Sequence, residues 1–158
     1  MCAILDANVA SEIFGKRKSR AGEEFRKWLD SGSSALALVS GGKLADELKG
    51  NAHFRGWSRT AIQYGRFRLV DRAEVETQAA KLRQSRACIS DDEHIIALAQ
   101  ISHARLLFSN DANLHKDFKD KSLIHDPEGK IYSTLKNKDF TPSKKRLLAD
   151  GNLCVTDK

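Results

Sequence analysis

The chain has 158 residues, of which 41% are hydrophobic and 30% charged, a balance that excludes intrinsic disorder and suits a single folded domain. Lysine and arginine number 27 against 21 acidic residues, and the net charge of +6 favours an anionic partner such as nucleic acid. No apolar run is long enough to span a bilayer and no secretory signal precedes the first predicted strand, so we expect a cytoplasmic protein without membrane contact.

The three cysteines, Cys2, Cys88 and Cys154, are odd in number and show no paired spacing. Thiols without such a pattern are typical of a reducing compartment. We therefore expect neither a disulfide framework nor a thiolate zinc site in this chain.

Predicted strands and helices alternate along the first half of the chain. Short apolar runs predict strands, and apolar residues at helical spacing predict helices. Ser40 directly precedes a helical pattern, and we expect it to cap that helix. The predicted strands lie at residues 3–5, 35–39 and 66–70, and the predicted helices at 20–29, 41–48 and 55–64.

The second half continues the alternation. A helix begins after Asp71, which we expect to be its cap, and a second helix covers residues 91–102. A fourth strand is predicted at 105–109 and a fifth at 122–126. Strands that alternate with helices indicate parallel crossovers, so we predict a three-layer α/β/α sandwich with a mostly parallel sheet of roughly five strands.

The pattern weakens from residue 130 onward, where lysines are frequent and apolar residues scattered. We therefore expect a folded domain over residues 1–129. Residues 130–158 are predicted to form a basic C-terminal extension that is only partly ordered.

Residues 48–70 contain no acidic side chain but several arginines interleaved with aromatic residues. Cations beside aromatic planes suit nucleic acid, because they offer phosphate contacts and stacking surfaces together. The alternative is an amphipathic pair of elements whose aromatic residues lie in the core. The candidate nucleic-acid-binding residues are Arg55, Arg59, Arg66 and Arg68.

Two acids follow predicted strands directly. Asp6 comes after the first strand and Asp111 after the fourth, so both are expected at the carboxyl edge of the sheet, where open α/β sheets bind ligands. Considered alone, Asp6 is better explained as a helix N-cap, because caps are more common than active sites.

Two further acids border the apolar stripes of predicted helices. Glu47 lies three residues from Leu44 and adjoins Leu48, whereas Asp46 points away from that stripe. By the same geometry Asp92 faces inward from its helix. His94 could be a general base or a ligand, but it lies about 200° round that helix from Asp92, so we expect it to serve packing or the surface.

If Asp6, Glu47, Asp92 and Asp111 converge, their charges repel one another unless a cation lies between them. A ligand set of oxygens alone favours a hard divalent ion, Mg²⁺ or Mn²⁺. Such an ion beside a basic surface suits hydrolysis of phosphodiester bonds.

Four segments, "ILDANV", "SGGKLADEL", "DDEHIIALA" and "LLFSNDANL", resemble in order and spacing the acidic motifs of PIN-domain ribonucleases. The resemblance covers residues 1–124 and is strongest to the small stand-alone members, which include VapC-type toxins. It implies a five-stranded parallel sheet and cleavage of RNA with Mg²⁺ or Mn²⁺. In the toxin branch it also implies a cognate antitoxin protein and a homodimer.

Carried over to this chain, the resemblance assigns metal-binding and catalytic roles to four acids and supporting roles to two polar residues. Asn113 stands where many members have a further acid, and the basic tail is not part of the usual toxin. The acids are Asp6, Glu47, Asp92 and Asp111, and the supporting residues are Asn8 and Ser109.

Other functions are possible for an Asp that ends a first strand. A haloacid-dehalogenase-type phosphotransferase needs a proton-donating acid two residues later, where this chain has Asn8. A response-regulator receiver needs an Asp after a middle strand, where this chain has Ser40. A structure-specific DNA nuclease carries extra helical insertions that this chain lacks room for. A PIN fold that is catalytically weak or inactive and binds RNA or protein remains the main alternative.

Overall fold

The computed structural model describes residues 1–16, 18–31 and 37–154, so the predicted start of the second strand at residues 35–36 lies outside it. Five strands form one sheet in the order β3-β2-β1-β4-β5, and every pairing between neighbours is parallel. This confirms the predicted α/β class. The strands are β1 (Cys2–Leu5), β2 (Ala37–Gly41), β3 (Phe67–Val70), β4 (Leu106–Phe108) and β5 (Lys130–Tyr132).

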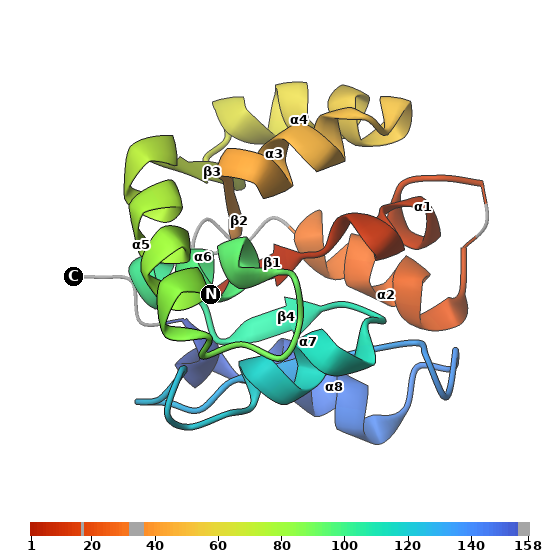
Figure 1. Ribbon diagram of the computed structural model, residues 1–158. Coiled ribbons are helices and arrows are strands. Elements are labelled where there is room, and N and C mark those ends of the chain that lie inside the picture. The colour runs from red at the N-terminus through yellow and green to blue at the C-terminus, as the bar shows by residue number, and fades with distance from the viewer. Residues whose placement is uncertain (17, 32–36, 155–158) are drawn as a thin grey trace.

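Helices cover both faces of this sheet, which gives the predicted three layers. In Figure 1, α5, α6 and α7 lie on the viewer's side of the strands, and α2 and α8 lie behind them. No helix in the described ranges has both the length and the apolar character needed to cross a membrane. The helices are α1 (Ala10–Ile13), α2 (Arg20–Leu29), α3 (Gly42–Lys49), α4 (Ala52–Gln63), α5 (Arg72–Ser85), α6 (Glu93–Ser102), α7 (Ala112–Phe118) and α8 (Pro142–Ala149).

The strand order reverses at β1. The chain moves from β1 to β2 to β3 in one direction, and then crosses to β4 on the other side of β1. In open parallel sheets, the point where the order reverses leaves a crevice at the carboxyl ends of the two central strands. The loops after β1 and β4 therefore meet at this point.

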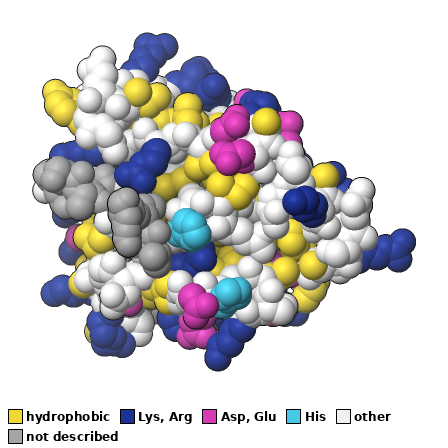
Figure 2. Space-filling model, turned by 90° about the vertical axis from the view of Figure 1, so that its left-hand side faces the viewer, with side chains coloured by type: hydrophobic (Ala, Val, Ile, Leu, Met, Phe, Trp, Pro, Cys, Tyr) yellow, Lys and Arg dark blue, Asp and Glu magenta, His cyan; other side chains and the backbone are white. Residues whose placement is uncertain are grey.

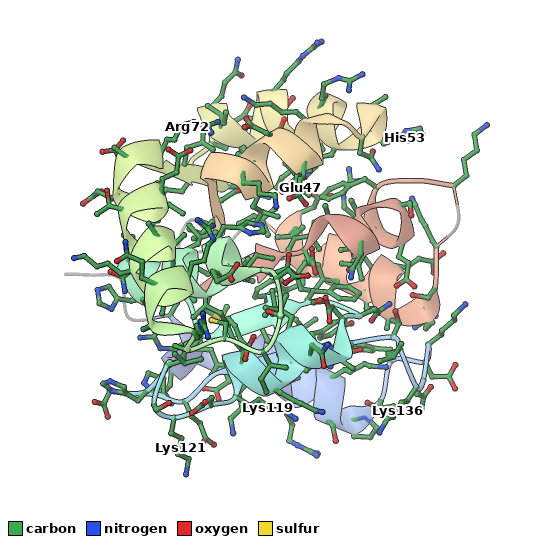
Figure 3. The ribbon with its side chains drawn as sticks, in the orientation of Figure 1. Glu47, His53, Arg72, Lys119, Lys121 and Lys136 are labelled. Carbon is green, nitrogen blue, oxygen red and sulfur yellow. A yellow bond between two sulfur atoms is a disulfide. The ribbon has the colours of Figure 1, made fainter. Side chains whose placement is uncertain are left out.

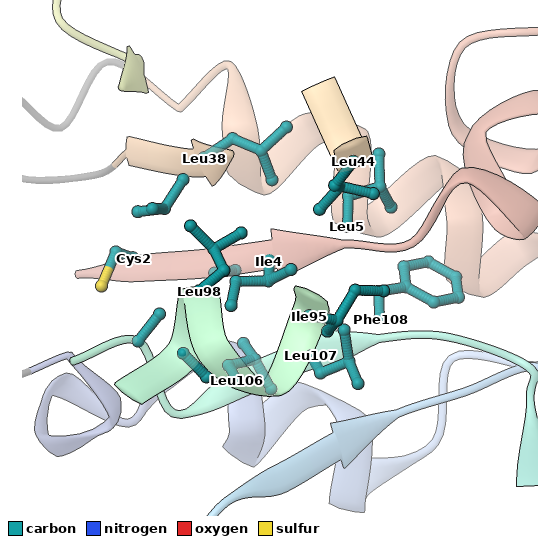
Figure 4. Packing of buried hydrophobic residues seen from close by; sticks show 14 of the residues in the cluster. Cys2, Ile4, Leu5, Leu38, Leu44, Ile95, Leu98, Leu106, Leu107 and Phe108 are labelled. Atoms are coloured by element: carbon teal, nitrogen blue, oxygen red, sulfur yellow. The ribbon is translucent and has the colours of Figure 1, made fainter. Parts of the chain in front are cut away.

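A continuous hydrophobic core holds these loops in place. Helix α6 packs Ile95 and Leu98 against Ile4 of β1 and Leu107 of β4 (Figure 4). All four side chains are fully buried. The two central strands and the helix that carries Asp92 are thus parts of one rigid unit.

The aromatic residues between residues 54 and 67 belong mainly to the core. Phe54 packs edge-on against Phe67, with 5.4 Å between ring centroids, and both are buried. Trp57 is half-buried against the same cluster, and only Tyr64 stands out, at 70% exposure. The core interpretation of these rings therefore describes Phe54, Trp57 and Phe67 better than a stacking surface does.

The fifth strand was predicted in the wrong place. Residues 122–126 form a turn-rich loop, and β5 instead begins at Lys130 and pairs with β4. Leu123 and Ile124 are buried although they lie in a loop, and this burial explains their apolar character. The expected division at residue 130 falls at the start of a strand, and Leu148 and Leu153 from the segment beyond it are buried in the common core.

The predicted cap at Ser40 is also wrong. Ser40 lies inside β2, fully buried, and its hydroxyl makes no hydrogen bond. The chain enters α3 through Gly41 and Gly42, and Gly42 has a φ of 54°. A positive φ favours glycine, so a glycine turn joins β2 to α3.

The cysteine prediction needs correction as well. Cys2 and Cys154 form a disulfide, with their Cα atoms 5.2 Å apart, while Cys88 is a free thiol. The two partners are separated by 152 residues in sequence. No local spacing could reveal this pair, because only the fold brings the last turn of the chain to the start of β1.

Candidate active site

Asp6 lies at the point where the strand order reverses. Its backbone N–H donates to Phe108 O across 2.9 Å, which extends the pairing of β1 with β4 by one residue. The side chain is only 6% exposed. The turn Ala7–Val9 that follows has no side-chain cap hydrogen bond. The backbone N–H groups of Asn8 and Ala7 nevertheless act on the Asp6 carboxyl and oppose the rise in its pKa.

Ser109 joins two of the acids. Its hydroxyl donates to Asp6 Oδ2 at 2.7 Å and accepts from the Asp111 N–H at 3.1 Å. Ser109 is completely buried directly after β4. The geometry fixes the direction of the Asp6 carboxylate relative to the loop that carries Asp111.

Asp111 is the N-cap of α7. Its Oδ1 accepts from the N–H groups of Asn113 at 3.0 Å and Leu114 at 3.2 Å. The helix end satisfies one oxygen and leaves the other for the site, where the Asp111 carboxyl is hydrogen-bonded to Asp92. Asp111 therefore serves the fold and the site together.

Asp92 stands at the start of α6 but makes no side-chain cap hydrogen bond there. Burial raises its pKa to about 6, and the charges of Asp6, Asp111 and Glu47 raise it further in the same direction. An uncapped carboxyl whose pKa is raised by three other acids shares a small volume with them.

The pKa values of Asp6 and Glu47 are also raised. Burial raises the pKa of Asp6, opposed by the Ser109 hydrogen bond, and the charge of Asp111 adds to the rise. Burial also raises the pKa of Glu47, where Lys43 opposes the shift and Asp6 adds to it. The structure therefore brings all four predicted acids within electrostatic reach of one another. Figure 3 shows Glu47 on the side of α3 that faces the end of β1.

The donor set fits a hard divalent cation. All four groups offer carboxylate oxygens, and carboxylates that lie close to one another are stabilised by a positive ion between them. In the described part of the chain, no three His, Cys, Asp or Glu side chains stand close enough to hold an ion as they are.

Asn8, the second supporting residue, lies at the rim of the site. Its Oδ1 accepts from the Asn110 N–H at 3.4 Å. The Asn110 side chain donates to the Thr134 hydroxyl at 2.9 Å, and that hydroxyl donates to Glu12. This network ties the loop after β4 to the segment after β5. Sequence reasoning missed it, because Thr134 falls in the segment expected to be a loosely ordered tail.

His94 is buried beside the site. It is 7% exposed, and its Nε2 lies 3.6 Å from Glu47 Oε1 without a hydrogen-bond partner. Burial lowers the pKa of His94 to about 4, and Lys43 and Arg83 lower it further, so the ring is neutral at pH 7. The residue is buried as the packing interpretation expects, yet it touches the site.

The four candidate arginines do not converge on the acids. Arg55 and Arg59 lie on the exposed side of α4, where Arg55 Nη1 donates to Lys49 O at 2.5 Å. Arg66 precedes β3, and Arg68 within it is near the amino group of Met1. Arg66 and Arg68 therefore belong to the amino-end side of the sheet, opposite to Asp6. Figure 2 shows that side, with Lys and Arg side chains around its rim rather than in one patch.

A family model described as "PIN domain" matches residues 3–119. No curated protein sequence matches the chain.

Two solved structures are similar to the chain. One is VapBC2 from Rickettsia felis bound to a DNA fragment from its promoter, at 16% identity and a TM-score of 0.47, covering 84% of this chain and 98% of the other. The second is a toxin–antitoxin complex from Klebsiella pneumoniae, at 20% identity and a TM-score of 0.46, covering 81% of this chain and 99% of the other.

Proposed function

The chain belongs to the PIN domain family, and from this we propose that it is a divalent-metal-dependent endoribonuclease that hydrolyses RNA phosphodiester bonds. The observation that carries the proposal is the group of four carboxylates at the point where the strand order reverses, in which Asp6, Glu47 and Asp111 all raise the pKa of Asp92. A fold has no need of four acids in one place, and their repulsion costs stability unless they bind a cation.

Asp6, Glu47, Asp92 and Asp111 are the residues that would hold Mg²⁺ or Mn²⁺. When bound, such an ion supplies activation of water and neutralisation of charge at the phosphate. The protein's own part is orientation: Ser109 directs the Asp6 carboxylate, and α7 directs Asp111 through its first N–H groups. Asp92 makes no cap hydrogen bond at the start of α6, so its carboxyl is not committed to the helix end.

RNA is the proposed substrate on the family resemblance and on the net charge of +6. Arg55 and Arg59 are the better candidates for contacts with its backbone, because Arg66 and Arg68 lie toward the amino ends of the strands. The proposal includes a cytoplasmic location for the protein.

The toxin assignment is a further part of the proposal. It includes a cognate antitoxin that blocks the site and a homodimeric nuclease. Light scattering on the purified chain tests the dimer, and co-purification with the product of a neighbouring gene tests the antitoxin. A monomer without such a partner would remove the toxin assignment and leave the nuclease unaffected.

Cleavage of a mixed pool of single-stranded RNA with Mg²⁺ or Mn²⁺ is the direct test. We expect cleavage by the wild-type chain, loss with EDTA, and loss of at least about 100-fold in Asp6→Asn and Asp92→Asn, because each removes a charged ligand. The matched control is Asp91→Asn, which changes an exposed neighbour of Asp92 and should leave the rate unchanged.

Two results would contradict the proposal. Cleavage that survives EDTA or Asp92→Asn would exclude a carboxylate–metal mechanism. A folded protein that binds RNA but cleaves none with either metal would favour the alternative, a catalytically weak or inactive PIN fold that binds RNA or protein.

A further inference from the structure

Glu47 differs from the other acids of the site in having no anchor. Asp6 is held by Ser109, and Asp111 is held by the first turn of α7. The Glu47 side chain is 38% exposed and makes no hydrogen bond to any residue in the described ranges. A ligand carboxylate on a flexible side chain must lose rotamer freedom on binding an ion, which weakens that binding.

His94, in contrast to Glu47, is a buried side chain with a polar atom that has no partner. It is buried at the second position of α6, and its Nε2 has no hydrogen-bond partner. A buried ring nitrogen without a hydrogen-bond partner lowers the stability of the fold by about 1–3 kcal/mol. A histidine at such a position therefore indicates a role other than packing. An apolar side chain of similar size would fill the same space without that cost.

Glu47 Oε1 lies 3.6 Å from this nitrogen. This distance exceeds a normal N–H···O hydrogen bond by about 0.5 Å or more. His94 is fixed in the core and Glu47 is partly exposed, so a rotation of the Glu47 side chain is the movement that closes the gap.

We propose that His94 is a positioning residue, whose Nε2–H donates to Glu47 Oε1 and turns that carboxylate toward a divalent ion shared with Asp6. The inference rests on the proposed function, since it needs the ion to bind. The hydrogen of the neutral ring is then on Nε2. Groups that hold a ligand in this way commonly change metal affinity by about 10–100-fold when removed.

Binding of Mn²⁺ alone, measured by isothermal titration calorimetry on the full chain, tests the proposal without any RNA. His94→Leu removes the donor at similar volume, and we expect Mn²⁺ to bind about 10-fold more weakly. His94→Gln can carry an amide N–H to nearly the same place, and its affinity should remain within about 3-fold of wild type. His94→Asn, whose amide is too short to reach, should behave like His94→Leu and gives a polar alternative if the leucine variant does not fold.

The same substitutions in a Glu47→Gln background separate positioning from a general structural effect. If His94 acts through the Glu47 carboxylate, His94→Leu should weaken Mn²⁺ binding far less in this background than in the wild type. Equal losses in both backgrounds, or no loss in the wild type, would overturn the proposal. Failure of the wild-type chain to bind Mn²⁺ would overturn the proposed function together with this inference, whereas unchanged binding by a folded His94→Leu would overturn the inference alone.

Discussion

Ser109 shows how one side chain coordinates two parts of the site. Its hydroxyl donates to Asp6 and accepts from the Asp111 backbone in a fully buried position. The single hydrogen of the hydroxyl is therefore committed to Asp6, and one of its lone pairs is committed to the Asp111 backbone. A serine immediately after β4 thus gives the Asp6 carboxylate one direction before any ion or substrate arrives.

Asp92 predicts how the metal-free protein responds to pH. Burial, followed by the neighbouring acids, raises its pKa from 3.8 to about 6, so the folded state holds this proton more tightly than the unfolded chain. Its contribution to stability is therefore fully present below about pH 4 and is lost as the pH rises through about 6. In EDTA, Asp92→Asn should be more stable than wild type by about 1–2 kcal/mol at pH 7.5, and the difference should vanish near pH 4.

Urea unfolding at the two pH values measures this difference. Saturating Mn²⁺ should reverse the order at pH 7.5, because the ion stabilises only a chain that keeps its ligands. A difference that is the same at both pH values would show that the effect of the asparagine is unrelated to the charge of Asp92.

At the scale of elements, α7 places Asp111 through its own N-terminus. Asp111 caps the helix with one oxygen and faces Asp92 with its carboxyl. Two substitutions separate these roles, because asparagine is a good N-cap but carries no charge, whereas alanine is neither. We expect Asp111→Asn to keep or raise the free energy of unfolding and Asp111→Ala to lower it by about 1–2 kcal/mol, while both lose RNA cleavage.

Chemical unfolding and the RNA assay on the same two variants give the comparison. Asp71→Ala provides a control, since Asp71 caps α5 at an exposed position away from the site. It should lose stability and keep cleavage. Cleavage by Asp111→Asn at the wild-type rate would remove Asp111 from the set of metal ligands.

The alternation of elements was predictable, but some boundaries and contacts were not. Buried strands such as β1 and amphipathic helices such as α2 leave strong periodic signals, and the stripe on α3 correctly indicated that Asp46 faces away, where it pairs with Arg72 at 2.8 Å. Strand β5 has three residues at a sheet edge and gave no such signal. The prediction instead placed the fifth strand at residues 122–126, which form a loop with Leu123 and Ile124 buried in it.

The site was likewise only partly readable from sequence. A carboxylate directly after a strand or beside an apolar stripe has a local signature, so Asp6, Glu47, Asp92 and Asp111 could be chosen as candidates. The link from Thr134 to the loop after β4 depends on β5 pairing with β4, which is a property of topology. Contacts of this kind have no signal within a window of ten or twenty residues.

At the scale of the whole molecule, the disulfide joins the beginning and the end of the described chain. Cys2 starts β1, and Cys154 follows the turn Gly151–Leu153. Leu153 of this turn is buried in the core. The backbone adds to this junction, because the Arg105 N–H donates to Leu153 O at 2.8 Å. The bond lies at the amino end of β1, whereas Asp6 lies just beyond the carboxyl end of the same strand.

This placement predicts that the disulfide affects stability and leaves chemistry unchanged. Closing a loop of this length removes conformational freedom from the unfolded chain, worth about 3–5 kcal/mol in the chain-entropy account. Dithiothreitol or Cys154→Ser should therefore lower the urea midpoint clearly. The rate of RNA cleavage at 25 °C should stay within about 2-fold of the oxidised wild type, because the position of Asp6 does not depend on the disulfide. Cys88→Ser is the matched control and should change neither quantity, because Cys88 is outside the disulfide. A urea midpoint that does not respond to dithiothreitol would show that the disulfide adds nothing to stability. Loss of RNA cleavage in the folded, reduced protein would show that the two ends of β1 are coupled.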